Sequence, residues 1–87
     1  MNAHAIRLAA DNARIFAAYH GARVIEGQWF EHTAGTLTIH LASAADLECL
    51  LDAGLRIELG DDHAVAYHRI GGVRVVYRAA LAEVGAA

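Results

Sequence analysis

The pattern of apolar positions predicts a helix at the start of the chain. Residues 3–20, AHAIRLAADNARIFAAYH, carry apolar side chains at helical spacing, and Gly21 follows where helices commonly end. One sector of this helix is lined mainly by alanines, so we expect it to pack closely against a sheet. A second apolar sector consists of Leu8, Ile15 and Tyr19, which either covers the edge of the sheet or meets a second chain.

Two extended runs follow this helix and predict a β-hairpin. The first, residues 22–32 (ARVIEGQWFEH), has a glycine inside it, which is typical of a β-bulge. After the turn at TAG, residues 36–41 (TLTIHL) alternate between apolar and polar positions, the pattern of a half-buried strand. Trp29 and Phe30 are neighbours, so on a regular strand they would face opposite sides, and one of them would be exposed or covered by a partner.

Residues 43–54 predict a second, shorter helix. Ser43 is suited to cap its N-terminus, Asp46 stands three residues later as in a capping box, and Gly54 provides a C-terminal stop. Periodicity then places its apolar side chains on one face, which comprises Ala44, Leu47, Leu50 and Leu51.

The rest of the chain predicts a three-stranded meander. Residues 55–59 (LRIEL) form a short strand, GDDH turns the chain, and residues 64–78 (AVAYHRIGGVRVVYR) read as two strands around a Gly71-Gly72 turn. Residues 79–87 are expected to form a short helical turn or a frayed tail.

These elements define a fold class. Their order, α-β-β-α-β-β-β, predicts a small α+β domain with an antiparallel sheet and two helices packed on it. A chain of 87 residues is expected to form one domain, spanning 1–87. The apolar fraction is 56% without glycine, whereas ordinary domains reach about 45–50% with glycine counted. Much of the excess is alanine, yet it favours a homodimer or an obligate partner.

The inventory of reactive side chains argues against an enzyme. The only serine, Ser43, already has a role as a helix cap, and the absence of lysine excludes a Schiff base. Cys49 stands beside Glu48, which would raise the pKa of the thiol and make it less nucleophilic. No glycine-rich loop suited to a phosphate occurs, so we expect neither catalysis nor a cofactor.

The cysteine count and the apolar runs bear on the compartment. A single cysteine excludes an internal disulfide and a cysteine-based zinc site, and it fits a reducing compartment. The first residues lack the basic region and continuous apolar core of a signal peptide, and no run reaches the length of a membrane helix. We therefore expect a cytoplasmic protein with no membrane partner.

Six histidines raise the question of a metal or ligand site. His63 and His68 are five positions apart, so on one strand they point to opposite faces. We expect no metal site, with the histidines scattered and individually hydrogen-bonded. The alternative is a small ligand-binding or enzymatic domain with a pocket between helices and sheet, where the polar group would be His40, His68 or His63.

The last two strands concentrate arginine on one face. A two-residue Gly71-Gly72 loop pairs Ile70 with Val73, and this register gathers four candidates on the face away from the core: Arg69, Arg74, Arg78 and Tyr67. Directly opposed arginines repel unless the face is wet or an acidic partner covers it. The composition is typical of protein contacts, while a solvated face and a single-stranded nucleic-acid platform are the alternatives. A net charge of −3 argues against nucleic acid.

Together these patterns predict a non-enzymatic module that binds an acidic patch on another protein and forms a homodimer. The residues expected to bind the partner are Arg69, Arg74, Arg78, Tyr67 and Trp29. The residues expected at the dimer interface are Leu8, Ile15 and Tyr19. One concrete version is an inhibitor or adaptor from a bacterial phage or mobile element, such as an anti-CRISPR protein. That version rests on size, the lack of a recognisable active site and spare surface rather than on a motif.

Overall fold

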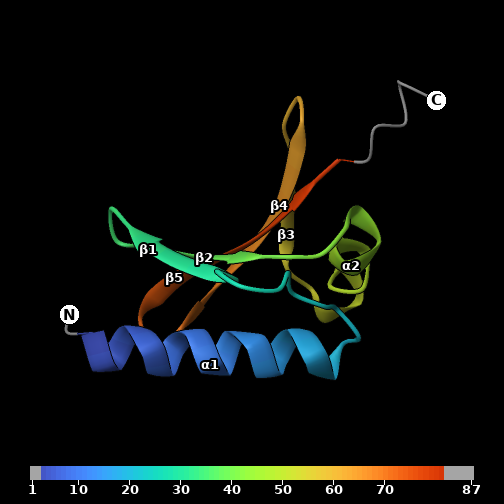
Figure 1. Cartoon of the computed structure of the whole chain (residues 1–87). Helices are drawn as coiled ribbons and strands as arrows, with labels where there is room; N and C mark the ends of the chain where they lie inside the picture. Colours follow the sequence, from blue (N-terminus) through green and yellow to red (C-terminus); the bar gives the residue numbers. More distant parts are fainter. Residues whose placement is uncertain (1–2, 82–87) are drawn as a thin grey trace.

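The computed structural model describes residues 3–81, which form a small α+β domain. Two α-helices, one 3-10 helix and five strands follow one another along the chain (Figure 1). Their bounds are α1 (Ala3–Tyr19), β1 (Phe30–Thr33), β2 (Thr36–His40), α2 (Ala44–Glu48), η1 (Leu51–Ala53), β3 (Arg56–Leu59), β4 (His63–Ile70) and β5 (Val73–Ala80).

All five strands belong to one mixed sheet in the order β1-β2-β5-β4-β3. The prediction of an antiparallel sheet is wrong at one place, because β2 and β5 run parallel, with Thr36 beside Arg74 and His40 beside Arg78. β5 takes the central position because it has the most apolar inward face of the five strands. Its buried side chains are Val73, Val75, Tyr77 and Ala79.

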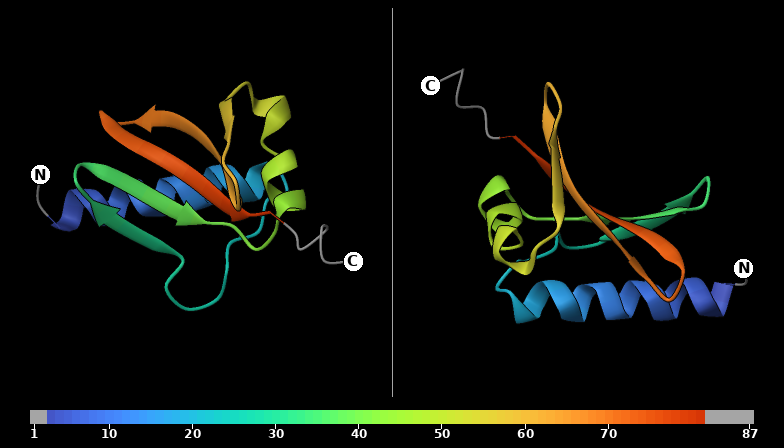
Figure 2. Two further views of the ribbon diagram at one scale, coloured as in Figure 1. Left: turned by 90° about the horizontal axis from the view of Figure 1, so that it is seen from above. Right: turned by 180° about the vertical axis from the view of Figure 1, so that it is seen from behind.

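Both helices pack on the same face of this sheet. α1 contacts β2, β4 and β5, and α2 contacts β4 and β5. Seen from above, the strands lie across α1, and α2 stands at one end (Figure 2, left). The core between these layers is a single apolar cluster that includes Leu37, Ile39, Leu50 and Tyr77.

Alanines let α1 lie close to the sheet, as its sequence predicts. Ala10, Ala13 and Ala17 are fully buried, and Gly21 has a positive φ of 82°, which suits the residue after a helix end. The second apolar sector of α1 does not cover the sheet edge, because the exposed fractions of its side chains are high: Leu8 55%, Ile15 67% and Tyr19 84%.

The second helix is shorter than predicted. Ser43 caps α2, and its hydroxyl accepts a hydrogen bond from the backbone N–H of Asp46. After Glu48 the chain makes a turn and then tightens into η1, which ends at Gly54 with a φ of 81°. Leu51 still borders a groove with Ala44 and Leu47 of the predicted apolar face, but it is 51% exposed rather than buried.

Two strand boundaries also differ from the prediction. β1 begins only at Phe30, because the chain before it forms a loop, which touches the sheet through a bridge between Val24 and Leu41 and through a hydrogen bond from the His40 N–H to the Trp29 carbonyl. β5 continues to Ala80, so the first residues of the expected C-terminal turn are strand. The remainder of that expected turn or tail, 82–87, lies outside the described residues.

Asp46 ties the segment after α1 to α2. Its carboxylate is only 3% exposed and accepts hydrogen bonds from the backbone N–H of Arg23 at 2.9 Å and from the Ser43 hydroxyl at 2.7 Å. The Arg23 guanidinium adds contacts at 3.1 and 3.4 Å. Burial by itself would raise the pKa of Asp46, but these hydrogen bonds outweigh it and hold the pKa below the ordinary value.

Candidate functional site

The face of the sheet opposite the helices carries the side chains that the sequence predicts to bind a partner, apart from Trp29, and we call it the open face. Within residues 3–81 no helix lies over it (Figure 2). Strand register arranges its side chains in three rows. The first row is Thr33, Thr36, Arg74 and Arg69; the second is Glu31, Thr38, Val76, Tyr67 and Arg56; the third is His40, Arg78, Val65 and Glu58.

Positive charge is concentrated on the open face. Four of the chain's arginines stand on it with two glutamates, although the whole chain has a net charge of −3. Both glutamates already have partners, since Glu31 lies 2.9 Å from Nε2 of His40 and Glu58 accepts a hydrogen bond from the Tyr67 hydroxyl at 3.0 Å. Within the described range, none of these four arginines forms an ion pair with a carboxylate.

Arg69 and Arg74 are directly opposed, as the Gly71-Gly72 turn predicts. Their guanidinium groups engage different partners, which reduces their mutual repulsion. Arg69 donates from Nη1 to the carbonyl of Gly72 at 3.0 Å. The guanidinium carbon of Arg74 lies 5.5 Å from the centre of the Tyr67 ring, a cation–π arrangement. Two of the predicted arginines are therefore held in place before any partner arrives.

Arg78 also stands on the open face, beside His40 and Val65 in the third row. Arg56, which is not among the predicted binding residues, stands on the same face. It pairs with Tyr67 across β3 and β4. The three-residue connection 60–62 sets this register, and a hydrogen bond from the Gly60 N–H to the His63 carbonyl closes it. Period-2 alternation in LRIEL, combined with that loop length, is the signal that could have located Arg56.

Trp29 does not belong to the open face. It lies just before β1 and is only 9% exposed within the core. Its ring packs against Phe30 with centroids 4.7 Å apart, and the Arg14 guanidinium of α1 covers it at 4.8 Å. The prediction of opposite sides is wrong because Trp29 is not in the strand, so Trp29 cannot act as a surface anchor.

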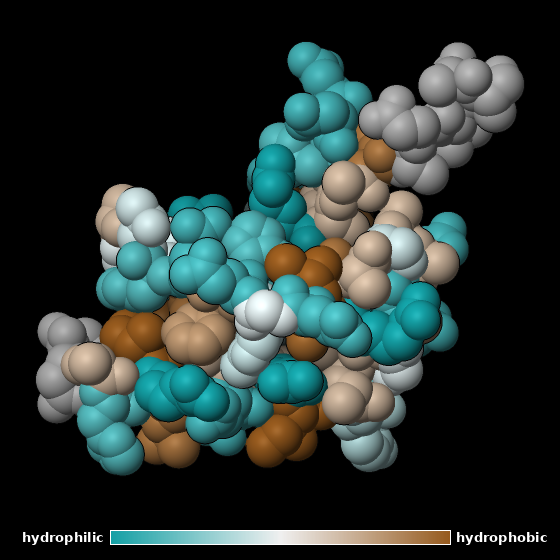
Figure 3. Space-filling view, in the orientation of Figure 1, coloured by the Kyte–Doolittle hydropathy of each residue, from teal (hydrophilic) through white to brown (hydrophobic). Residues whose placement is uncertain are grey.

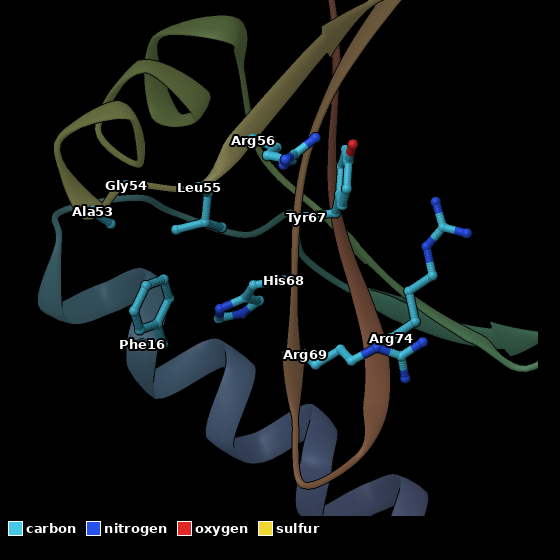
Figure 4. Close-up of a pocket in the computed structure, with 9 residues that line it drawn as sticks. All are labelled: Phe16, Ala53, Gly54, Leu55, Arg56, Tyr67, His68, Arg69 and Arg74. Atoms are coloured by element: carbon cyan, nitrogen blue, oxygen red, sulfur yellow. The ribbon is translucent and has the colours of Figure 1, made fainter.

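A cleft of about 530 Å³ opens where the open face meets the start of β3 (Figure 4). We call it the arginine cleft. Figure 4 shows Phe16, Leu55 and His68 on one side of β4, and Tyr67, Arg69 and Arg74 on the other. Its lining is Phe16, Ala53, Gly54, Leu55, Arg56, Tyr67, His68, Arg69 and Arg74. The cleft therefore has a cationic outer wall and an apolar inner wall.

His68 belongs to the inner wall and is held uncharged at neutral pH. Its Nε2 lies 2.8 Å from the buried hydroxyl of Tyr77, and its ring centroid is 4.8 Å from that of Phe16. Burial lowers the pKa of His68, and burial raises the pKa of the Tyr77 hydroxyl. An apolar group can thus approach this wall without meeting a charge.

The three histidines considered as ligands do not converge. His40 contacts Glu31, His63 contacts Asp62 at 2.7 Å, and His68 contacts Tyr77. Across residues 3–81, no three histidine, cysteine, aspartate or glutamate side chains group closely enough to hold a metal ion. Only His68 of the three lines the arginine cleft.

Apolar surface lies away from the open face as well. In the space-filling view, brown apolar atoms alternate with teal polar ones along the lower edge, where α1 runs (Figure 3). A groove of about 230 Å³ lies between α2 and β3 and is bordered by Leu51 and Leu59, both exposed. Over the described ranges no helix is long and apolar enough to cross a membrane.

Comparison with protein families, with curated proteins and with solved structures finds no significant match.

Proposed function

We propose that this protein is a non-enzymatic binding module whose open face docks onto an acidic surface of another protein. One observation carries the proposal: Arg56, Arg69, Arg74 and Arg78 share a sheet face that no helix of residues 3–81 covers, and none of them has a carboxylate partner there. A guanidinium is weakly hydrated and matches a carboxylate with two parallel hydrogen bonds, so such a face favours an acidic partner.

Several contacts favour a protein over a nucleic acid. Glu31 and Glu58 stand among the arginines and would repel phosphates. Tyr67, the one tyrosine in the three rows, is covered by Arg74 and hydrogen-bonded to Glu58, so it is poorly suited to stacking on a base. Partly fixed Arg and Tyr side chains are common anchors at protein interfaces, because little conformational entropy remains to be lost on binding.

The test is a double charge reversal, Arg69→Glu with Arg74→Glu. Affinity capture from lysate of the producing cells, quantified by mass spectrometry, should lose its partners with this variant while circular dichroism stays unchanged. The matched control is Arg7→Glu with Arg14→Glu, which changes the net charge equally at two exposed positions of α1; its circular dichroism must also stay unchanged, because Arg14 covers the Trp29 ring. Partners retained by the open-face variant, or lost equally with the α1 variant, contradict the proposal.

We also propose that the protein forms a homodimer through Leu8, Ile15 and Tyr19. These three side chains are the exposed apolar sector of α1, and burying them between two copies would release water from each. Light scattering should report twice the chain mass of 9.3 kDa. Tyr19→Glu should give a folded monomer, because this side chain is 84% exposed. A wild-type monomer at tens of micromolar overturns the proposal.

Two narrower expectations stay predictions. Action in the cytoplasm rests on the sequence. The narrower proposal of an anti-CRISPR-like inhibitor from a phage or mobile element rests on the small size of the chain and on its spare interaction surface. The structural support concerns the chemistry of binding, namely an arginine-rich sheet face suited to an acidic protein.

A further inference from the structure

β4 has a free edge inside the arginine cleft. The ladder between β3 and β4 runs from Leu59↔Ala64 to Arg56↔Tyr67. Beyond Tyr67, residues 68–70 have no strand neighbour on that side within the described part of the chain. The chain at 53–55 diverges from β4 here, and the cleft of about 530 Å³ occupies the place where the next strand would continue.

The hairpin turn shows which backbone groups face this gap. Gly71 and Gly72 both have positive φ, 56° and 83°, as a type I′ turn requires. Such a turn is closed by a hydrogen-bonded pair, here Ile70 and Val73. Hydrogen-bonded and non-hydrogen-bonded pairs alternate along an antiparallel ladder, so the backbone N–H and C=O of Arg69 point away from β5 and toward the cleft.

We propose that the arginine cleft binds a short, extended, acidic peptide segment, which adds to the free edge of β4 as an extra strand. The proposal rests on the proposed function and specifies how the partner is held. An exposed edge is a ready template for another strand, and main-chain hydrogen bonds give such binding its affinity. Charge complementarity selects the occupant, because Arg56, Arg69 and Arg74 line the same cleft.

The two walls of the cleft also define a sequence pattern for the peptide. Side chains of an added strand alternate between the two faces of the sheet. Those on the outer side meet the three arginines, whereas those on the inner side meet Phe16, Leu55 and uncharged His68. The segment should therefore alternate acidic and apolar residues, and a block of acidic residues should fit less well.

The first experiment measures peptide binding by fluorescence anisotropy. The probe is a fluorescein-labelled seven-residue peptide of alternating glutamate and leucine. Two comparator peptides contain the same glutamates and leucines. In the first, they stand in block order. The second keeps the alternating order and the charges but is N-methylated at every second peptide nitrogen, which removes donors for strand pairing. The alternating peptide should bind about tenfold more tightly than the N-methylated one, the effect of losing one or two good hydrogen bonds. It should also bind more tightly than the block peptide, whose side-chain order does not match the two walls of the cleft.

A matched pair of variants locates the site. Arg56→Gln changes only a cleft arginine and should weaken the alternating peptide about tenfold, the loss expected for one charge-assisted hydrogen bond. Arg78→Gln removes the same charge from the open face outside the cleft and should change the affinity less than about twofold. Equal effects of the two variants would indicate general attraction to the face and overturn the cleft.

Amide hydrogen exchange tests the strand itself. The Arg69 amide should exchange fast in the free protein and become protected with peptide, whereas the His68 and Ile70 amides should be protected in both states. Strand addition is refuted if the Arg69 amide gains no protection and the alternating peptide is not preferred. The proposed function still stands in that case if the open-face charge reversal loses the natural partners. Tighter binding of oligothymidylate or inorganic phosphate than of the peptide overturns both.

Discussion

Asp46→Ala is expected to be among the most damaging single substitutions in this chain, through a backbone contact rather than an ion pair. The substitution leaves the Arg23 N–H and the Ser43 hydroxyl without the acceptor that lies 2.9 and 2.7 Å away. Each orphaned group costs about 1–2 kcal/mol when partly buried. The guanidinium contact adds little, because the Arg23 side chain is 76% exposed and such pairs contribute at most about 1 kcal/mol.

The expected loss in the free energy of unfolding is therefore about 2–4 kcal/mol. In a domain of this size, that loss lowers the melting temperature by roughly 8–30 °C. Urea denaturation followed by Trp29 fluorescence and far-ultraviolet circular dichroism measures it. Arg23→Ala is the control, because it removes the guanidinium and keeps the backbone donor, so it should cost less than about 1 kcal/mol. Equal losses for the two variants would refute the reasoning.

The same carboxylate gives the fold an acid limit. Because the folded pKa of Asp46 lies below its ordinary value of 3.8, the ionised group contributes stability above that pH. This contribution is lost as the pH falls through the folded pKa. Asp46→Asn, which cannot ionise, should be less stable than the wild type at neutral pH and should approach it on strong acidification. A constant difference at all pH values would contradict this.

Three further outcomes are expected. Burial lowers the pKa of His68 from 6.5, so on acidification the unfolded chain takes up the proton first, and the stability of the fold should fall as the pH drops below that value. The urea midpoint of His68→Gln should therefore vary less with pH over the same range. If the midpoint of the variant varies as steeply as that of the wild type, His68 is not the group responsible. Ala13→Leu overpacks a fully buried position and should lower the free energy of unfolding by about 1–3 kcal/mol. Ala18→Leu, on the exposed side of α1, should change it by less than about 0.5 kcal/mol. Equal melting temperatures for the two variants would mean that α1 is not closely packed on the sheet. Tyr77→Phe should lower the free energy of unfolding by about 1 kcal/mol. Adding His68→Gln should lower it little further, because both substitutions remove the same 2.8 Å contact. Additive losses in chemical denaturation would show that the two residues act separately.

Local signals in the sequence specify the last hairpin almost completely. A two-residue loop at Gly71-Gly72 permits one register, and the structure has it from Ile70 opposite Val73 onward. The predicted core side of this hairpin is confirmed as well, since Val75 and Tyr77 are fully buried. Three members of the open face, Arg69, Arg74 and Arg78, follow from this register alone.

Contacts between distant segments could not be predicted from sequence patterns. Nothing in TLTIHL tells whether this strand will pair with the first or the last strand of the meander, because the pairing depends on which of them can lie inside the sheet with a strand on each side. The position of Trp29 depends on where β1 begins, and the loop before it decides that. Asp46 reads locally as a capping-box residue, but its carboxylate also accepts a hydrogen bond from the backbone N–H of Arg23, more than twenty positions earlier.

The parallel ladder between β2 and β5 has a consequence for how this chain folds. The β1–β2 hairpin and the β3–β4–β5 meander can each form from neighbouring residues, but in the sheet they meet only along this ladder. Its partners are remote in the chain, for example Leu37 with Val75. Bringing them together closes a long loop before its contacts compensate for the lost entropy. Substitutions along the ladder should therefore slow folding, whereas substitutions at the tips of the two hairpins should mainly speed unfolding.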